Sequence, residues 1–187
     1  MAALDSDIAR TISRQGRRFL VTGNDDVAMQ YGYEYDSGLG EDVLTGALYA
    51  YAADTEITSA VIPTGVTAIG DNGFYNCDSL QQISLPEGLT TVGHSSFGSC
   101  ENLESVSLPS TLTTIGEWAF SDCYSLTSIS LPAGLQRIES GAFQSTALTA
   151  LDLPAGLDYI GNSVFCNCSS LPALTIPAGV ELGDDAF

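Results

Sequence analysis

The first units of the sequence repeat at a constant interval of 23 residues. The interval separates the phenylalanines and the cysteines of successive units: Phe74, Phe97 and Phe120, and Cys77, Cys100 and Cys123. A fixed period of roughly 20–50 residues is typical of a solenoid, in which each unit is one small element stacked on its neighbours. A single unit cannot close a core alone, so the repeat constrains the architecture of the chain and says little about its chemistry.

Six units follow one another, and they open at Ile57, Leu80, Leu103, Leu126, Leu148 and Leu171. In the second unit Ile83 and Leu85 alternate with polar residues, which predicts a short strand with one buried face. Pro86 follows, and because it has no amide hydrogen it ends the strand. We expect Gly88–Gly93 to turn the chain, after which the phenylalanine and the cysteine return to the interior.

The order Leu-x-x-Ile-x-Leu-Pro-x-x-Leu-x-x-Ile-Gly-x-x-Ala-Phe-x-x-Cys resembles the BspA-like leucine-rich repeats over residues 57–187. The resemblance implies a β-rich, right-handed solenoid of about six 22–23-residue units. It also implies a surface-displayed binding or adhesion module, often on bacterial cells or in mobile elements, and not an enzyme. Two units depart from the pattern: the fourth has Thr146 near the expected cysteine, and the sixth is one residue short between Val180 and Gly183. The fourth unit is also one residue short before Leu148, and we interpret both shortenings as tolerated turn deletions.

The chain is strongly acidic, with a formal net charge of −18 and no lysine. Nucleic-acid binding requires basic side chains that neutralise phosphates, so this composition argues against it. No apolar run is long enough to insert into a membrane, and an anionic membrane surface would repel the chain. The acidity either keeps the chain soluble or steers a cationic partner towards it.

The cysteines of successive units are predicted to stack at the spacing of neighbouring strands. That spacing falls in the Cα range of a disulfide, but parallel side-chain directions disfavour the bond. We therefore interpret Cys77, Cys100 and Cys123 as buried free thiols, with Cys168 in the same column and Cys166 facing outward. No histidine or second cysteine pair completes a metal site beside Cys166 and Cys168, so neither a metal nor a cofactor is expected.

Residues 1–56 precede the repeat, and we expect them to form a cap or an attachment segment. Leu4, Ile8 and Ile12 recur every four residues, which predicts an amphipathic helix over about residues 3–14. A helix this short is marginal alone and needs a surface to pack on, so it is the leading candidate for docking. The candidate docking residues are Leu4, Ile8, Ile12, Arg14, Arg17 and Arg18. The arginines contact either an acidic partner or the chain's own acidic solenoid.

The rest of this segment predicts strands near residues 19–22, 29–35 and 44–51. Five of the eight tyrosines lie between residues 31 and 51. They either cover the first repeat as a cap or form an aromatic docking face. The first residues contain no apolar stretch of the length that a secretory signal needs. We expect a location exposed at the surface of a phage particle or on a cell exterior.

Small polar side chains occupy the outer face of the predicted strands. This face either binds a glycan or an extended protein surface, or is only solvated. Trp118 occupies a variable position and is predicted to lie outside the phenylalanine core, as a contact residue or a partly buried one. The candidate partner contacts are Trp118, Gln82, Ser84, Ser105, Ser107, Ser128 and Ser130. No catalytic residue is expected, because no motif places a nucleophile beside His94, the single histidine.

These patterns together predict a non-enzymatic interaction module. In this hypothesis the N-terminus docks on a larger assembly, and the acidic solenoid binds or adheres to a protein or glycan surface. The alternative is a structural accessory protein of a phage particle, associated with the head or tail. The last unit stops at Phe187 without a polar cap, which offers an open end to a second copy or a neighbouring subunit.

Overall fold

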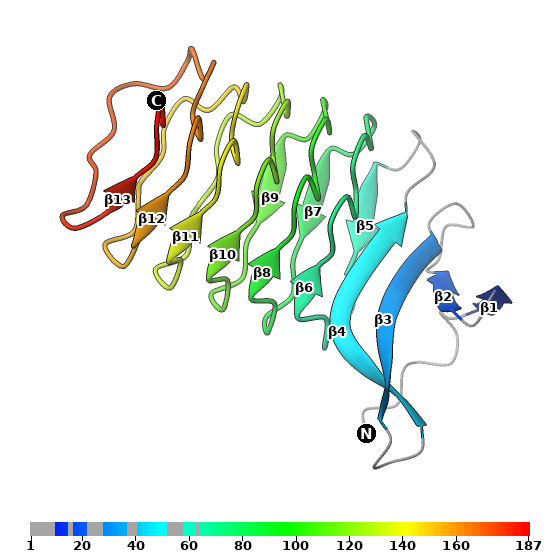
Figure 1. Ribbon diagram of the computed structural model, residues 1–187. Helices are drawn as coiled ribbons and strands as arrows, with labels where there is room; N and C mark the ends of the chain where they lie inside the picture. Colours follow the sequence, from blue (N-terminus) through cyan, green and yellow to red (C-terminus); the bar gives the residue numbers. More distant parts are fainter. Residues whose placement is uncertain (1–9, 15–16, 22–27, 37–40, 52–57, 63) are drawn as a thin grey trace.

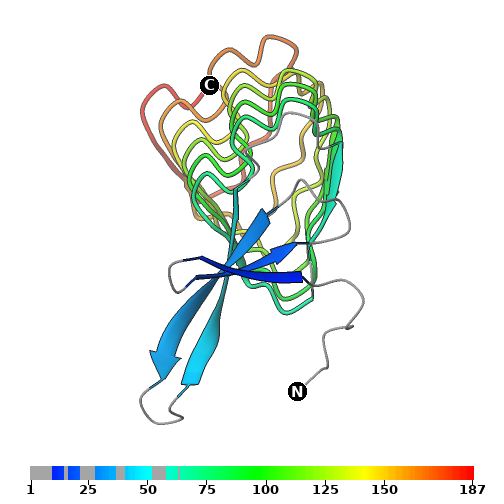
Figure 2. The same ribbon diagram turned by 90° about the vertical axis from the view of Figure 1, so that its right-hand side faces the viewer.

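The computed structural model describes residues 10–14, 17–21, 28–36, 41–51, 58–62 and 64–187, and only the backbone of residues 10–51 and of Ala60 and Val61. The chain winds into a parallel β-solenoid whose coils lie side by side (Figure 1). Figure 2, turned by 90°, shows successive coils one behind another, so equivalent residues form columns along the solenoid. The predicted solenoid of about 23-residue units is confirmed.

Two columns of strands run along the coils. The shorter is a three-stranded parallel sheet in the order β5-β7-β9, and the longer is a ten-stranded sheet that continues into the N-terminal strands. The solenoid strands are β5 (Ser59–Val61), β6 (Ala68–Ile69), β7 (Gln82–Ser84), β8 (Thr91–Val92), β9 (Ser105–Ser107), β10 (Thr114–Ile115), β11 (Arg137–Ile138), β12 (Tyr159–Ile160) and β13 (Glu181–Leu182).

The strand predicted around Ile83 is β7, but the interpretation of Gly88–Gly93 as a turn alone was incomplete. Thr91 and Val92 form β8, which pairs with β6 and β10 in the longer sheet. Branched side chains favour an extended backbone, and Gly93 donates its amide hydrogen to the carbonyl of Ile69 at 2.9 Å. The turn itself is confined to Glu87 and Gly88, and Gly88 has a φ of 95°.

Four antiparallel strands precede the solenoid: β1 (Arg10–Arg14), β2 (Arg17–Val21), β3 (Ala28–Asp36) and β4 (Glu41–Tyr51). β4 then pairs in parallel with β6, through Ala47 with Ala68 and Leu48 with Ile69, so these strands extend the longer sheet. The strands predicted near residues 19–22, 29–35 and 44–51 correspond to β2, β3 and β4. The tyrosine side chains of β3 and β4 lie outside the described part of the chain.

The helix predicted over residues 3–14 is wrong where the structure describes the chain, because Arg10–Arg14 is β1. Thr11 and Ile12 are β-branched and favour a strand, and β1 pairs with β2 in a register that places Ile12 opposite Phe19. A helix of this length has little stability of its own to oppose that pairing. Leu4 and Ile8 lie outside the described residues.

Phenylalanine rings form the centre of the core. The rings of Phe74, Phe97, Phe120, Phe143, Phe165 and Phe187 stack in this order, with centroids 5.2, 5.3, 5.5, 6.0 and 5.4 Å apart. The first four rings are fully buried. Offset stacking of aromatic rings adds to the stabilisation that comes from burying their area.

A column of cysteines runs beside the rings, as predicted. Cys100, Cys123 and Cys168 are buried, and each thiol donates a hydrogen bond to a phenylalanine carbonyl of the preceding coil, over 3.0, 3.2 and 3.0 Å. Thr146 occupies the same position in the fourth unit, where it is buried and bonds the carbonyl of Phe143 at 2.9 Å. The column therefore accepts a small side chain with a hydrogen-bond donor. Cys166 is half-buried.

The position of each ring in the stack sets its contribution to stability. Phe120→Ala removes a fully buried ring that has a partner on both sides, and we expect it to lower the free energy of unfolding by about 3–5 kcal/mol. Trp118→Ala, two residues away on the surface, is expected to cost much less. Denaturant titration of both variants measures the difference, and equal losses would contradict the assignment of these two side chains to the inside and the outside.

The buried thiol of Cys123 makes stability fall at alkaline pH. Burial raises the pKa of Cys123 to about 12. Above the ordinary thiol pKa the unfolded chain releases a proton that the folded chain keeps, so stability is lost as pH rises towards the folded value, by about 1.4 kcal/mol per pH unit. Cys123→Thr, which copies Thr146, is expected to fold and to lose less stability between about pH 9 and 11. Unfolding titrations at several pH values give the two slopes, and parallel slopes would refute this explanation.

Candidate binding surfaces

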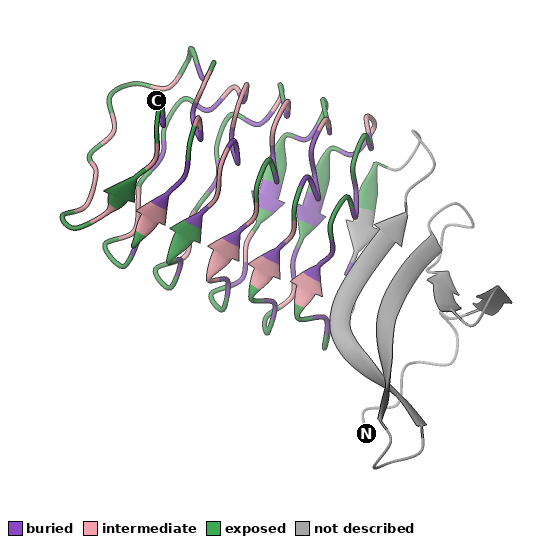
Figure 3. Cartoon of the chain, in the orientation of Figure 1, coloured by how far each residue is buried: buried purple, intermediate pink, exposed green. Residues whose placement is uncertain are grey.

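The outer side chains of β7 and β9, with the equivalent positions of the next coil, which is not a strand there, form a polar surface, which we call the strand face. Its residues alternate with Ile83, Val106 and Ile129, which are buried (Figure 3). All of its residues are exposed, and all were predicted to point outward: Gln82, Ser84, Ser105, Ser107, Ser128 and Ser130. The alternation follows from the period of two in a strand, which the sequence displays directly.

An open groove crosses the strand face over β5, β7 and β9. It is lined by Ser59, Gln82, Ile83, Ser84, Ser105, Val106 and Ser107. The register places Ser59, Gln82 and Ser105 in one row and brings Ser84 beside Ser107. This lining carries hydroxyl and amide groups and no charge, so its chemistry is hydrogen bonding to a neutral polar ligand.

The opposite turns of the coils form a second surface, which we call the turn ridge. It comprises residues 70–79, 93–102, 116–125, 139–147 and 161–170, which lie between a strand of the longer sheet and the leucine that opens the next unit. Backbone hydrogen bonds join the ridge from coil to coil, as from the amide of Trp118 to the carbonyl of Ser140 at 2.9 Å.

One column of turn residues, which continues past the turn ridge to Asp185 in the last coil, has a left-handed backbone in every coil. It contains Asn72, Ser95, Trp118, Gly141, Ser163 and Asp185, whose φ angles are 57, 47, 55, 64, 53 and 50°. Asn and Gly adopt this conformation readily, whereas a bulky side chain does so rarely. Trp118 is held there because the hydrogen bonds of both neighbouring coils fix the backbone.

Trp118 lies outside the core, as predicted, with 46% of its surface exposed. Its indole covers Gly141 in the next coil so closely that a β-carbon there would overlap it. The imidazole of His94 lies on the other side, with a ring centroid 6.0 Å from that of Trp118. The structure does not bring Trp118 together with the strand face, so the predicted contact residues form two surfaces.

Sequence reasoning missed two exposed aromatics on the turn ridge, Tyr75 and Tyr124. The available signal was their register, since they follow Phe74 and Cys123 directly and therefore occupy turn positions. The Tyr124 hydroxyl donates a hydrogen bond to Oδ1 of Asp122 at 3.2 Å. The nearby negative charge of Asp122, together with this hydrogen bond, raises the pKa of Tyr124.

Arg137 lies on β11 of the longer sheet, where its neighbours are aromatic and acidic. Its Nε donates a hydrogen bond to Oε1 of Glu139 at 2.7 Å, and its guanidinium carbon lies 4.3 Å from the ring centroid of Tyr159. The hydrogen bond to Glu139 raises the pKa of Arg137. This arrangement combines a charge-assisted hydrogen bond with a cation–π contact.

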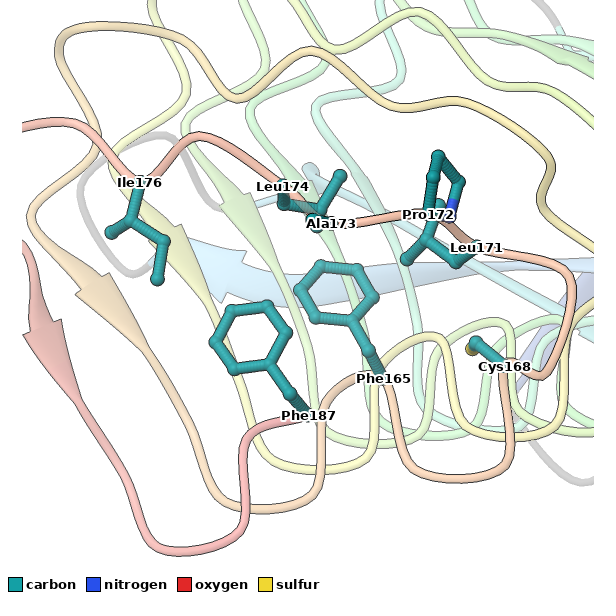
Figure 4. Close-up of a pocket in the computed structure, with 8 residues that line it drawn as sticks. All are labelled: Phe165, Cys168, Leu171, Pro172, Ala173, Leu174, Ile176 and Phe187. Atoms are coloured by element: carbon teal, nitrogen blue, oxygen red, sulfur yellow. The ribbon is translucent and has the colours of Figure 1, made fainter.

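An apolar groove opens at the C-terminal end of the solenoid (Figure 4). It is lined by Phe165, Cys168, Leu171, Pro172, Ala173, Leu174, Ile176 and Phe187. The ring of Phe187 stacks on Phe165 but is itself exposed.

The predicted docking residues of the N-terminus are only partly described. Arg14 lies on β1 and faces Arg17 of β2 in the register, while Arg18 of β2 is opposite Ser13. Their backbones therefore share one hairpin at the end of the longer sheet, together with Ile12.

Among residues 58–62 and 64–187, no group of three His, Cys, Asp or Glu side chains is arranged to hold a metal ion. His94 lies 3.6 Å from Glu117 in an exposed position, as the interpretation of it as a turn residue requires. No helix in the described part of the chain is long and apolar enough to cross a membrane.

A family model matches residues 47–172, and its description is a BspA type leucine-rich repeat region in six copies. The chain belongs to this family. The comparison with curated proteins found no significant match.

Solved structures of bacterial repeat proteins are similar to this chain. A leucine-rich repeat protein from Bacteroides ovatus is 26% identical with a TM-score of 0.65, over 82% of this chain and 42% of that one. A leucine-rich cell surface protein from Faecalibacterium prausnitzii is 26% identical with a TM-score of 0.51, over 91% of this chain and 55% of that one. The T. pallidum leucine-rich repeat protein, 24% identical with a TM-score of 0.62, supports the fold alone, over 82% of this chain and 83% of that one. The chain thus spans about half the length of the first two.

Proposed function

We propose that this chain is a non-enzymatic interaction module that binds a protein or glycan surface through its strand face. The observation that carries the proposal is the uncharged, hydroxyl-rich groove over β5, β7 and β9 in a chain with a formal net charge of −18. Successive coils of a solenoid build an extended surface of this kind, which suits a large and flat partner. Membership in the repeat family supports the proposal.

We also propose that the module is displayed on the outside of a cell. The similarity to a cell surface protein of F. prausnitzii supports this location. The phage hypothesis has no support from the solved structures named above, which are bacterial, and it stays a prediction.

Attachment through the N-terminus remains part of the proposal, with a strand in place of the helix. β1 stands at the end of the strand order of the longer sheet, and an edge strand can pair with a strand of another protein. Its hairpin also carries four of the chain's five basic residues, Arg10, Arg14, Arg17 and Arg18, which favour an acidic partner.

The strand face is tested by placing arginines on it. The triple variant Ser84→Arg, Ser107→Arg, Ser130→Arg changes only exposed side chains, so it is expected to fold and to lose binding by about tenfold or more. A matched control, Thr67→Arg, Thr90→Arg, Gln136→Arg, adds the same charge at exposed positions beside the longer sheet and is expected to bind as the unmodified chain does. Binding to panels of immobilised glycans and surface proteins is the measurement. Equal losses in both triple variants would rule out the strand face.

The N-terminal hairpin is tested by deletion. Removing residues 1–18 takes away β1 and the first two residues of β2. It is expected to abolish attachment while the solenoid keeps its unfolding transition, because each coil contacts only its neighbours. Circular dichroism reports the fold, and light scattering with cell-envelope fractionation reports the attachment. A truncated chain that still assembles would contradict the docking role.

A further inference from the structure

Three large aromatic side chains are exposed on the turn ridge. Tyr75, Trp118 and Tyr124 have 49, 46 and 54% of their surface exposed. Among residues 64–187, the other large apolar side chains with comparable exposure are Leu182 and Phe187, at the end of the solenoid. Trp and Tyr are enriched among the residues that dominate binding energy at protein interfaces.

Two of these rings rest on glycines of the next coil. The Trp118 indole covers Gly141, and a β-carbon at Gly98 would lie 3.2 Å from Cδ2 of Tyr75. Each ring is therefore supported from behind by backbone, which limits its motion and leaves part of its surface to solvent. Rigid aromatics lose little conformational entropy when a partner binds.

The turn ridge also carries negative charge. Its carboxylates around the aromatics are Asp71, Asp78, Glu101, Glu117 and Asp122, and no Lys or Arg occurs between residues 64 and 136. A purely apolar partner would remove water from these carboxylates without replacing its hydrogen bonds. An acidic polypeptide or a nucleic acid would be repelled. Charge complementarity therefore selects a cationic partner.

Arg137, on the longer sheet of the same molecule, shows how an arginine contacts an aromatic ring and a carboxylate together. The guanidinium of Arg137 lies 4.3 Å from the Tyr159 ring centroid, and its Nε bonds Glu139 at 2.7 Å. On the turn ridge, Tyr124 is hydrogen-bonded to Asp122 at 3.2 Å, and Trp118 follows Glu117 in the chain. The turn ridge therefore carries both kinds of group that Arg137 contacts, aromatic rings and carboxylates, as neighbours in the same turn.

We propose that the turn ridge around Tyr75, Trp118 and Tyr124 binds an arginine-rich segment of another polypeptide. Arginine side chains stack on the exposed parts of these rings, which at Trp118 is the part of the indole left open beside His94. They donate hydrogen bonds to Asp122 and to Glu117, whose Oε2 also lies 3.6 Å from Nδ1 of His94. Arginine fits better than lysine, because its planar guanidinium stacks on a ring and bonds a carboxylate at the same time. This surface is separate from the strand face, so the proposal does not depend on the function proposed above.

The single tryptophan makes the test direct, since the fluorescence of the chain reports on Trp118. The probe is a peptide of alternating arginine and serine, titrated at about 150 mM NaCl to screen non-specific attraction. We expect saturable binding with a change in fluorescence, and weaker binding of the corresponding lysine peptide. By calorimetry, Trp118→Ala is expected to raise the Kd about tenfold or more, the loss typical of a dominant interface aromatic.

Gly141→Ser provides a second variant that keeps the tryptophan. Serine already occupies this left-handed column at Ser95 and Ser163, so the backbone accommodates it, but its side chain displaces the indole. We expect the same loss of peptide binding as in Trp118→Ala. Full binding by a folded Gly141→Ser chain would overturn the assignment of the indole as the contact.

A pair of variants with equal charge separates a specific site from general acidity. Glu117→Gln with Asp122→Asn removes two charges from the turn ridge, and Glu181→Gln with Asp158→Asn removes two near the longer sheet. Only the first pair is expected to weaken peptide binding.

Three outcomes would each overturn the proposal: equal effects of the two pairs, no binding of the peptide at all, or a glycan that gives the fluorescence change in place of the peptide. Self-association of the chain that Trp118→Ala abolishes would identify a second copy as the occupant and overturn the assigned partner. The strand-face triple variant is expected to bind the peptide normally. The proposal for the turn ridge and the function proposed for the strand face are therefore tested by different variants, and one can fail without the other.

Discussion

The contact between each coil and the next is the interaction on which the rest of the structure depends. A phenylalanine ring has its stacking partners only in the adjacent coils, at 5.2–6.0 Å, and the turn amides find their carbonyls there as well. Because each coil is held on both sides, its backbone conformation is set by its column and not by its own residue. This explains why a tryptophan is found at a φ of 55°.

The same constraint separates tolerant positions from intolerant ones. Ring and leucine positions require bulk, whereas the cysteine position requires a small donor that reaches a carbonyl of the ring column. Thr146 satisfies that requirement with a hydroxyl in place of a thiol. The cysteines are therefore explained by packing and hydrogen bonding, and functional interest moves to the columns that never enter the core.

Those outer columns form two surfaces of different chemistry. The strand face is neutral and rich in hydroxyls, because small polar residues alternate with the buried ones on β7 and β9. The turn ridge combines exposed aromatics with carboxylates. A solenoid with two such surfaces can contact two different partners, which agrees with a role as an interaction module and gives each partner its own set of test residues.

The sequence by itself determined the solenoid, its repeat length, its core and the outward positions of the strand face, because periodic burial is written in local spacing. Prediction from the sequence failed where pairing with distant strands decided the secondary structure of a segment. Thr91–Val92 became a strand because β6 and β10 flank it, and Arg10–Arg14 became a strand because it pairs with β2. Tyr75 shares one ridge with Trp118 and Tyr124, which belong to a turn two coils away, only because successive coils stack on one another. Only the tertiary structure brings such residues together, since no local pattern records which turn positions become neighbours.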